Sequence, residues 1–275
     1  MEGVYCVSEQ SKICMYIAAH KKFTLPSIEH YVPIEVGAAL RDEHFGYIRD
    51  DEGENISAKN PFFCELTAYY WIWKNSDADI VGLSHYRRYF SKYRINPDER
   101  YYLKPEEMEA LMEQYDVVLP EHFYWRKHNL KSGYYAGAGV EPDLDTIAQI
   151  IQELYPEYSK TYQDVLSQHE ASYCNMFVMK KKDFDAYCKW LFDILFEAER
   201  RINISDYTSA EKRIFGYMSE LLLNVWVARN QKRVCYKPMV VNETFGKKKK
   251  VLRICEKIGL DALTKAVYCV DSKFR

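Results

Sequence analysis

The sequence predicts an α/β fold in which helices cover both faces of a mixed or largely parallel sheet, followed by a helical C-terminal appendage. Short apolar runs alternate along the chain with longer amphipathic segments, as strands and helices of one sheet do. The hydrophobic fraction of 48% and the charged fraction of 28% are those of an ordinary globular chain. A length of 275 residues is sufficient for one substantial core and one appendage.

Strands are expected where apolar runs are too short to form helices. The run at residues 13–19 (ICMYIAA) ends at His20, Lys21 and Lys22, as a buried strand does when it leads into a polar loop. The last predicted strand precedes the basic end of the chain. The six predicted strands are residues 13–19, 31–36, 79–83, 116–119, 175–179 and 234–240.

Helices are expected where apolar residues recur at helical spacing. The first begins at Asn60, a good N-cap, followed by Pro61, which suits the first helical position. Glu106 and Glu107 favour the start of the second helix because their charges oppose its dipole. The five predicted helices are residues 60–74, 105–114, 144–154, 182–200 and 209–229.

Composition narrows the class of protein. The net charge of −2 gives no field that would favour nucleic acid, and no run of 18 apolar residues is present to span a membrane. The eight cysteines lie far apart without zinc-ligand spacing, which fits a reducing cytosol. The N-terminal sequence lacks the pattern of a signal peptide. We therefore expect a cytoplasmic protein with one domain at residues 1–245.

Residues 246–275 form a basic, amphipathic tail in which four lysines, 247–250, precede spaced apolar residues. This pattern suits an anionic membrane surface, which would place the protein at the inner face of the plasma membrane. It suits a helix packed on the main domain equally well.

Two basic segments follow predicted strands, at His20-Lys21 and at His85-Tyr86-Arg87-Arg88. Ligands of open α/β sheets bind beyond the carboxyl ends of the strands, so both segments are expected at a ligand site. The planar guanidinium of arginine binds phosphate oxygens in pairs, which makes Arg87 and Arg88 candidates for phosphate binding. The alternative is a solvated loop or a structural salt bridge.

Other candidate groups carry weaker signals. One polar loop contains Asp51, Asn55, Ser57 and Asn60. These residues could bind ribose or sugar hydroxyls. From the residues alone we favour the alternative, in which they only form turns and cap the following helix. Glu220 is a lone acid in an apolar helix, where burial would raise its pKa and suit it as a general base; the alternative is a structural pairing with a residue such as Arg213.

Several familiar motifs are absent or misplaced. Asp77-Ala78-Asp79 begins a predicted strand, and Asp143-Leu144-Asp145 has the pattern of a helix start, so neither is expected to hold a metal ion. There is no Walker A loop, no dinucleotide-binding glycine fingerprint and no nucleophile elbow, which weakens kinase, dehydrogenase and hydrolase interpretations.

Several sequence segments between about residues 13 and 240 resemble those of a known protein family. HYRRYF after a predicted strand, together with NMFVMK, is the most specific part. The chain resembles bacterial capsular and exopolysaccharide biosynthesis glycosyltransferases, a group long described as a domain of unknown function. The matching segments are residues 53–60 (GENISAKN), 63–68, 71–73, 81–83, 85–90 (HYRRYF), 175–180 (NMFVMK), 185–196 and 215–226.

The resemblance implies a GT-A-like, Rossmann-type sheet that binds a nucleotide diphosphate sugar. It suggests transfer of a hexose, such as galactose or galactofuranose, from a UDP donor to a lipid-linked oligosaccharide in capsular, exopolysaccharide or O-antigen synthesis. In an ordinary GT-A enzyme the strand matching residues 79–83 leads into Asp-x-Asp, whereas here it leads into His85-Tyr86-Arg87-Arg88. A divalent metal is therefore not expected, and Arg87 and Arg88 are expected to replace it at the leaving diphosphate.

The resemblance also implies roles for the remaining candidates. Glu220 matches the helix from which many inverting GT-A enzymes take their base, so we expect an inverting transferase with His85, Arg87, Arg88 and Glu220 as its catalytic residues. The residues expected at the donor are His20, Lys21, Asp51, Asn55, Ser57, Asn60 and Asn175.

Two other functions remain open at this point. A non-catalytic carbohydrate-binding or scaffold protein of the same pathway would bind sugar without UDP, and the 24 tyrosines would suit it. A phosphoryl or nucleotidyl transferase would also use arginines, but it would need Mg²⁺ and a pair of carboxylates near His85.

Overall fold

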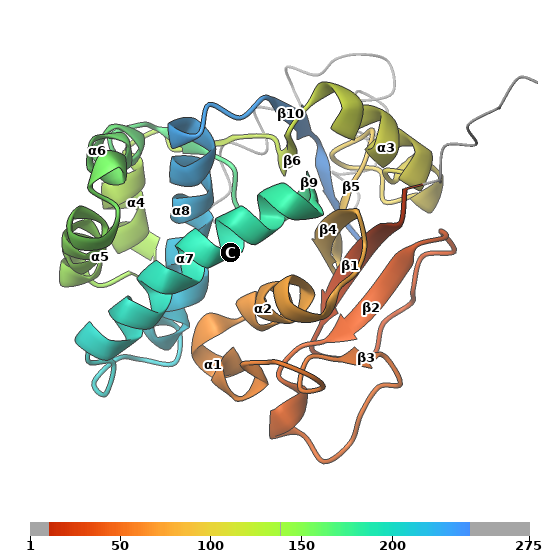
Figure 1. Cartoon of the computed structure of the whole chain (residues 1–275), viewed down its shortest axis with the longest axis horizontal. Helices are drawn as coiled ribbons and strands as arrows, with labels where there is room; N and C mark the ends of the chain where they lie inside the picture. The colour runs from red at the N-terminus through yellow and green to blue at the C-terminus, as the bar shows by residue number, and fades with distance from the viewer. Residues whose placement is uncertain (1–10, 138, 243–275) are drawn as a thin grey trace, which may run out of the picture.

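A nine-stranded mixed sheet forms the centre of the protein in the computed structural model, which describes residues 11–137 and 139–242 (Figure 1). Strands β7 (Phe123–Tyr124) and β8 (Glu170–Ala171) form a separate two-stranded ladder. The expected tail at 246–275, and with it the proposed boundary at residue 245, lies outside the described residues. The strands of the main sheet are β1 (Ile13–Ala19), β2 (Tyr31–Glu35), β3 (Ile48–Arg49), β4 (Ile80–His85), β5 (Arg88–Phe90), β6 (Val117–Pro120), β9 (Phe177–Lys180), β10 (Val234–Lys237) and β11 (Met239–Val241).

The sheet is mostly parallel, with the strand order β10-β6-β9-β4-β1-β2-β3. Strands β4, β1, β2 and β3 run parallel to one another, whereas β9 is antiparallel to both β4 and β6. The carboxyl ends of β3, β2, β1, β4, β6 and β10 therefore meet at one edge. The predicted α/β class with a mixed sheet is confirmed.

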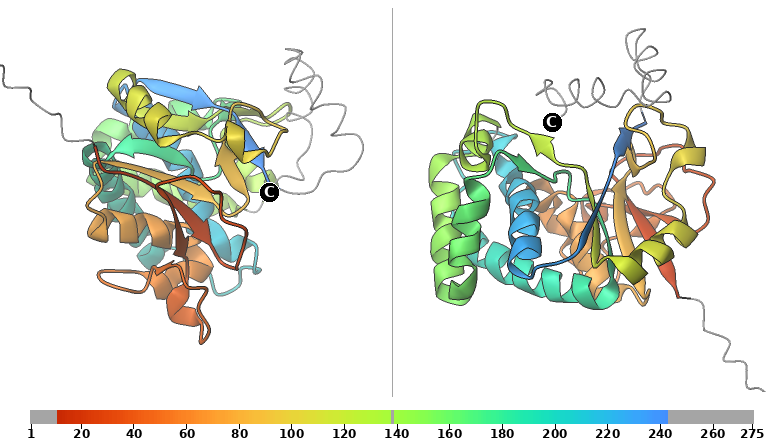
Figure 2. Two further views of the ribbon diagram at one scale, coloured as in Figure 1. Left: turned by 90° about the vertical axis from the view of Figure 1, so that its right-hand side faces the viewer. Right: turned by 90° about the horizontal axis from the view of Figure 1, so that it is seen from above.

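Helices cover the sheet and extend beyond it. In Figure 1, α2 and α7 lie in front of the sheet, and α4, α5, α6 and α8 gather to one side of it. Seen from above in Figure 2, that group forms a helical layer beside the strands. Among the described residues, no helix has the length and apolar character needed to cross a membrane. The helices are α1 (Asn60–Phe63), α2 (Leu66–Asn75), α3 (Pro105–Gln114), α4 (Leu130–Gly137), α5 (Glu141–Leu154), α6 (Ser159–Leu166), α7 (Lys181–Arg201) and α8 (Ile214–Arg229).

The alternation of side chains along β1 creates two cores, one on each face of the sheet. Tyr16 and Ala18 pack on the face covered by α2, α7 and α8, while Met15 and Ile17 pack on the opposite face with Met108 of α3. Gly82 of β4 is needed beside Met15, because an added Cβ would approach the Met15 Cε to 2.7 Å and the Phe177 carbonyl oxygen to 3.0 Å.

The expectation of one continuous helix at 60–74 is wrong. Cys64 has φ of 52°, which separates α1 from α2, and the Asn60 side chain donates to the Cys64 carbonyl at 2.8 Å across the break. Asn60 is the first residue of α1 and not its N-cap, which is Lys59. No glycine or proline marks this interruption in the sequence.

The expectation of one strand at 234–240 is also wrong. Pro238 divides the segment, so that β10 pairs in parallel with β6 while β11 pairs antiparallel with β5. The sequence prediction also missed α4, α6, β3, β5 and the β7–β8 ladder. The remaining predicted strands and helices are present within a few residues of their predicted bounds.

Candidate active site

The centre of the candidate site is the turn that follows β4. His85 ends β4, Tyr86 and Arg87 form the turn, and Arg88 begins β5 in register opposite His85. Because β1 runs parallel to β4 with Ala18 beside His85, the residues after β1 reach this turn. The His20 and Tyr86 ring centroids are 4.9 Å apart, and Lys21 Nζ is 5.0 Å from the Tyr86 centroid.

A cluster of basic side chains from four segments surrounds this turn. We define the basic cluster as His20, Lys21, Arg41, Arg87, Arg88 and Arg213. Partial burial lowers the pKa of His20, and the charges of Lys21, Arg41, Arg87 and Arg213 lower it further, so each of these cations lies close enough to act on His20. The positive charge of this cluster disfavours the protonated form of His20, and it attracts an anion.

Arg41 and Arg88 of the basic cluster differ in their contacts. Arg41 donates to the Val36 carbonyl at 2.7 Å and lies 3.4 Å from the buried carboxylate of Glu35, so it is fixed at the end of β2. Across residues 11–137 and 139–242, the half-buried guanidinium of Arg88 makes no hydrogen bond or ion pair. Arg88 is therefore available to a ligand.

His85 is buried, and its burial favours the neutral imidazole. Burial lowers its pKa; the carboxylate of Glu65 opposes this shift, and Arg88 adds to it. Its Nε2 lies 2.6 Å from the Cys174 carbonyl oxygen, which only accepts, so Nε2 carries the proton and Nδ1 has the free lone pair.

The backbone at Cys174 and Asn175, which accepts the hydrogen bond from His85, is strained, and hydrogen bonds from other elements hold it in place. Cys174 and Asn175 have φ of 76° and 46°, in the left-handed region that non-glycine residues seldom adopt. Glu220 Oε1 accepts from the Cys174 amide at 2.9 Å, and Tyr69 donates its hydroxyl proton to the Asn175 carbonyl at 3.0 Å. This turn thus joins β4, α2 and α8.

The Asn175 side chain completes that junction. Its Nδ2 donates to Glu65 Oε1 at 2.8 Å and to the Gly216 carbonyl at 3.0 Å, while its Oδ1 accepts from Ser219 Oγ at 2.9 Å. Asn175 is only 1% exposed. Asn175 therefore supports the backbone beneath the site. Its side chain is not exposed at a surface where it would contact a donor, contrary to the expectation from the sequence.

The predicted polar loop lies at the same edge, beside β2 and β3, but its side chains bond mainly to one another. Ser57 is fully buried and donates to Asp50, which also accepts from the Gly37 and Ala38 amides at 2.8 and 2.9 Å. The paired bond from Arg49 lowers the pKa of Asp51.

The other two loop candidates also serve the loop itself. Asn55 donates to the Asp51 and Gly53 carbonyls at 2.9 Å each, and Asn60 donates within the α1–α2 break. The described bonds of all four loop candidates stay between residues 36 and 67, so their contacts shape the loop and do not reach the turn after β4.

Sequence reasoning missed three groups of this site. Arg41 follows the predicted strand β2, so the rule that selected His20 and His85 would have selected it as well. Arg213 and Glu65 precede α8 and α2, and each lies close to the Cys64 thiol at the helix break. Their position depends on that break, which the sequence does not signal.

The two Asp-x-Asp sequences lie away from this edge. Lys12 binds Asp77 through its Nζ and Asp79 through its amide, at the opposite end of β1 and β4. Asp143 is buried in the first turn of α5, where it accepts from Tyr134, Tyr207 and the Val140 amide. In the part of the chain that the structure describes, no group of three His, Cys, Asp or Glu side chains could hold a metal ion.

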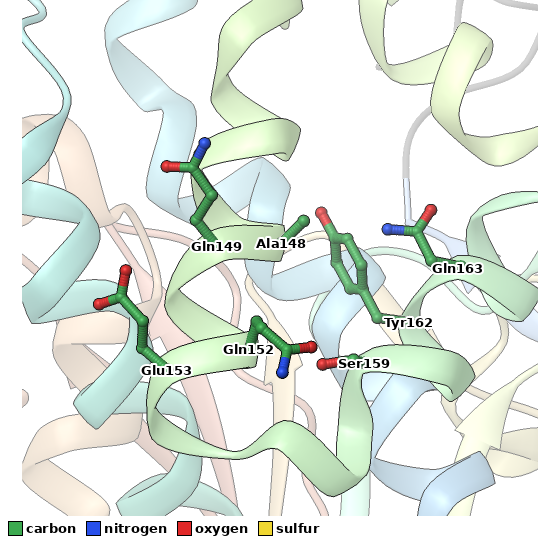
Figure 3. A pocket seen from close by; sticks show the side chains of 7 residues that line it. All are labelled: Ala148, Gln149, Gln152, Glu153, Ser159, Tyr162 and Gln163. Atoms are coloured by element: carbon green, nitrogen blue, oxygen red, sulfur yellow. The ribbon is translucent and has the colours of Figure 1, made fainter.

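A separate hollow of about 440 Å³ lies between α5 and α6 (Figure 3). Its polar lining includes Gln149, Gln152 and Gln163, with Tyr162 between the two helices. The hollow is in the helical layer, whereas the basic cluster is at the edge of the sheet, so we do not assign the site to it.

Comparison with known proteins places the chain in a family. The family model described as "Domain of unknown function (DUF4422)" matches residues 14–232. The chain belongs to the DUF4422 family. No curated protein matches it.

Among solved structures, this DUF4422 protein is similar to WbbM, described as a bifunctional glycosyltransferase in its apo form. The match has 31% sequence identity and a TM-score of 0.79, and it covers 85% of this chain. The chain spans 46% of the length of WbbM. The central sheet with flanking helices is therefore the Rossmann-like fold of a solved glycosyltransferase.

Proposed function

We propose that this DUF4422 protein is a GT-A-like glycosyltransferase that transfers a hexose from a UDP-sugar to a lipid-linked oligosaccharide. The similarity to WbbM supports the transferase activity. The basic cluster at the carboxyl ends of β1, β2 and β4 supports the nucleotide diphosphate donor, because this is where ligands of such sheets bind.

The observation that carries the proposal is the turn between β4 and β5. A diphosphate leaving group gains negative charge as the glycosidic bond breaks, and fixed cations that face it lower the barrier. Arg88 supplies a guanidinium that pairs with no group of the described chain, and Arg87, Lys21 and Arg41 bring further charge to the same edge. We assign Arg87 and Arg88 to the diphosphate and His20 to the nucleotide side.

The residues at this turn do not fit a divalent metal. Mg²⁺ and Mn²⁺ prefer carboxylate ligands, whereas the end of β4 presents His85, Arg87 and Arg88. Glu65, the acid whose charge acts on His85, binds Asn175 with one oxygen. We therefore propose that the arginines neutralise the leaving group without a metal.

Glu220 is the proposed general base. It would take the proton of an acceptor hydroxyl while that oxygen forms a bond to the anomeric carbon of the donor. The bond from that carbon to the β-phosphate oxygen breaks with its electron pair, and UDP leaves. A single displacement of this kind inverts the anomeric configuration.

The donor and product are tested by direct assay. We expect transfer from UDP-galactose or UDP-galactofuranose to a polyprenyl-diphosphate-linked oligosaccharide, as capsular, exopolysaccharide or O-antigen synthesis requires. NMR of the product would give the anomeric configuration, and retention would contradict the single displacement.

Binding of UDP is expected to be independent of metal. Titration calorimetry with UDP should give the same dissociation constant, within about 2-fold, with EDTA and with Mn²⁺ or Mg²⁺. Binding that appears only with a cation would return a metal to the site. No binding of UDP under either condition, with the protein folded, would contradict the proposed donor.

Glu220→Gln is expected to lower kcat by about 100-fold with little loss of stability. The carbonyl of the substituted side chain still accepts from the Cys174 amide, so the strained turn keeps its support, while the group no longer takes a proton. The assay is turnover of the Glu220→Gln variant beside its thermal unfolding midpoint. Near-normal turnover would show that Glu220 only supports the turn.

A further inference from the structure

A continuous strip of aromatic and polar side chains lies on the β7–β8 ladder and neighbouring β10. We define the aromatic strip as His122, Tyr124, His169, Glu170 and Tyr236. The His122 and Tyr236 ring centroids are 4.4 Å apart, and His122 Nδ1 lies 3.4 Å from Glu170 Oε1. Glu170 pairs in register with Tyr124, whose ring centroid is 6.2 Å from that of His169.

The aromatic strip is open to solvent. Tyr124 is 42% exposed and Tyr236 is 44% exposed, although most large apolar side chains of this protein are buried in its two cores. The Glu170 side chain, between these two rings, is 56% exposed. Two tyrosine rings therefore face water with a carboxylate and an imidazole between them.

This combination matches the chemistry of a neutral sugar. One face of a hexose ring carries C–H groups that pack on an aromatic ring, and its rim carries hydroxyls that hydrogen-bond to carboxylate and imidazole. The negative charge of Glu170 disfavours a phosphate at the same place. A saccharide therefore fits the aromatic strip better than a nucleotide does.

The aromatic strip is also joined directly to the candidate active site. It follows the carboxyl end of β6, which shares its sheet edge with β1 and β4. Ser172 comes directly after β8 and donates its hydroxyl proton to the Pro120 carbonyl at 2.6 Å, which fixes the ladder to β6. Two residues later, Cys174 accepts the bond from His85.

We propose that the aromatic strip is the subsite for the sugar residues of the acceptor. This inference rests on the proposed glycosyltransferase function for its role, but the saccharide binding itself does not require UDP. The basic cluster holds the donor at β1 and β4, and the aromatic strip holds the acceptor chain at β6, with Glu220 and the Cys174 turn between them.

Saturation-transfer NMR tests the subsite with four neutral trisaccharides: maltotriose, chitotriose, mannotriose and a β-linked galactotriose. We expect at least one to bind the unmodified protein, and Tyr124→Ala and Tyr236→Ala each to weaken that binding by about 5-fold. Leu154→Ala is the matched control, because Leu154 is also exposed (46%) but lies on α5. UDP affinity, measured by calorimetry, should remain unchanged in all three variants.

The possible outcomes separate this subsite from the proposed function. Saccharide binding that neither tyrosine variant weakens, or no saccharide binding while UDP binds, would overturn the subsite and leave the transferase in place. Saccharide binding that depends on both tyrosines without any UDP binding would support the subsite in a non-catalytic carbohydrate-binding protein. Loss of self-association in the tyrosine variants, with no effect on saccharide, would make the strip an interface between copies.

Discussion

Arg88→Ala is expected to reduce the rate of sugar transfer by about 1000-fold and to leave the protein folded. Arg88 stands in register opposite His85 at the carboxyl end of β4, and its guanidinium makes no hydrogen bond or ion pair among residues 11–137 and 139–242. Its removal therefore costs no bond within the described protein. It removes a positive charge that stabilises the leaving diphosphate more strongly in the transition state than in the ground state. Turnover and thermal unfolding of the purified variant measure the two effects.

Two further variants locate the origin of the effect. Arg88→Lys keeps the charge but not the planar pair of donors, so it should recover only part of the lost rate. Arg100→Ala removes an arginine that is 77% exposed and paired with Asp98, and it should leave turnover unchanged. Turnover of Arg88→Ala within a few-fold of the unmodified enzyme would remove Arg88 from the diphosphate site.

The placement of the basic cluster was predictable in part because parallel strands share an edge. The apolar runs of β1 and β4 are evident in the sequence, so the approach of His20 and Lys21 to the segment after His85 follows from the topology. The same rule applied to β2 would have added Arg41. This part of the site depends on where the strands end, which hydrophobic patterns in the sequence indicate well.

The remaining features depend on packing that the sequence does not signal. The break at Cys64 occurs without glycine or proline, yet it places Glu65 and Arg213 beside the site. In the polar loop, the buried carboxylate of Asp50 accepts hydrogen bonds from the Gly37 and Ala38 amides. The sequence analysis instead selected the neighbouring Asp51 as a residue that binds the donor. Adjacent residues of one loop differ in burial for reasons that only the tertiary structure contains.

Asn175→Ala is expected to lower the free energy of unfolding by about 3 kcal/mol. The change removes three side-chain hydrogen bonds, to Glu65, Gly216 and Ser219, in a place that is almost fully buried. It also leaves alanine at φ of 46°, which costs about 1 kcal/mol for a residue with a Cβ and no local hydrogen bond. Urea denaturation gives the loss directly.

Asn175→Gly separates the two causes, because glycine adopts the left-handed conformation freely. It should lose the same hydrogen bonds as the alanine variant but recover about 1 kcal/mol relative to it. Asn203→Ala, on an exposed asparagine that bonds only to its own loop among the described residues, should change stability by less than about 0.5 kcal/mol. If Asn175→Ala were as stable as this control, the Cys174–Asn175 turn would owe its geometry to Tyr69 and Glu220 alone. A large loss that glycine partly restores would show that the left-handed conformation at this turn disfavours a Cβ without a local hydrogen bond, at the backbone that both His85 and Glu220 contact.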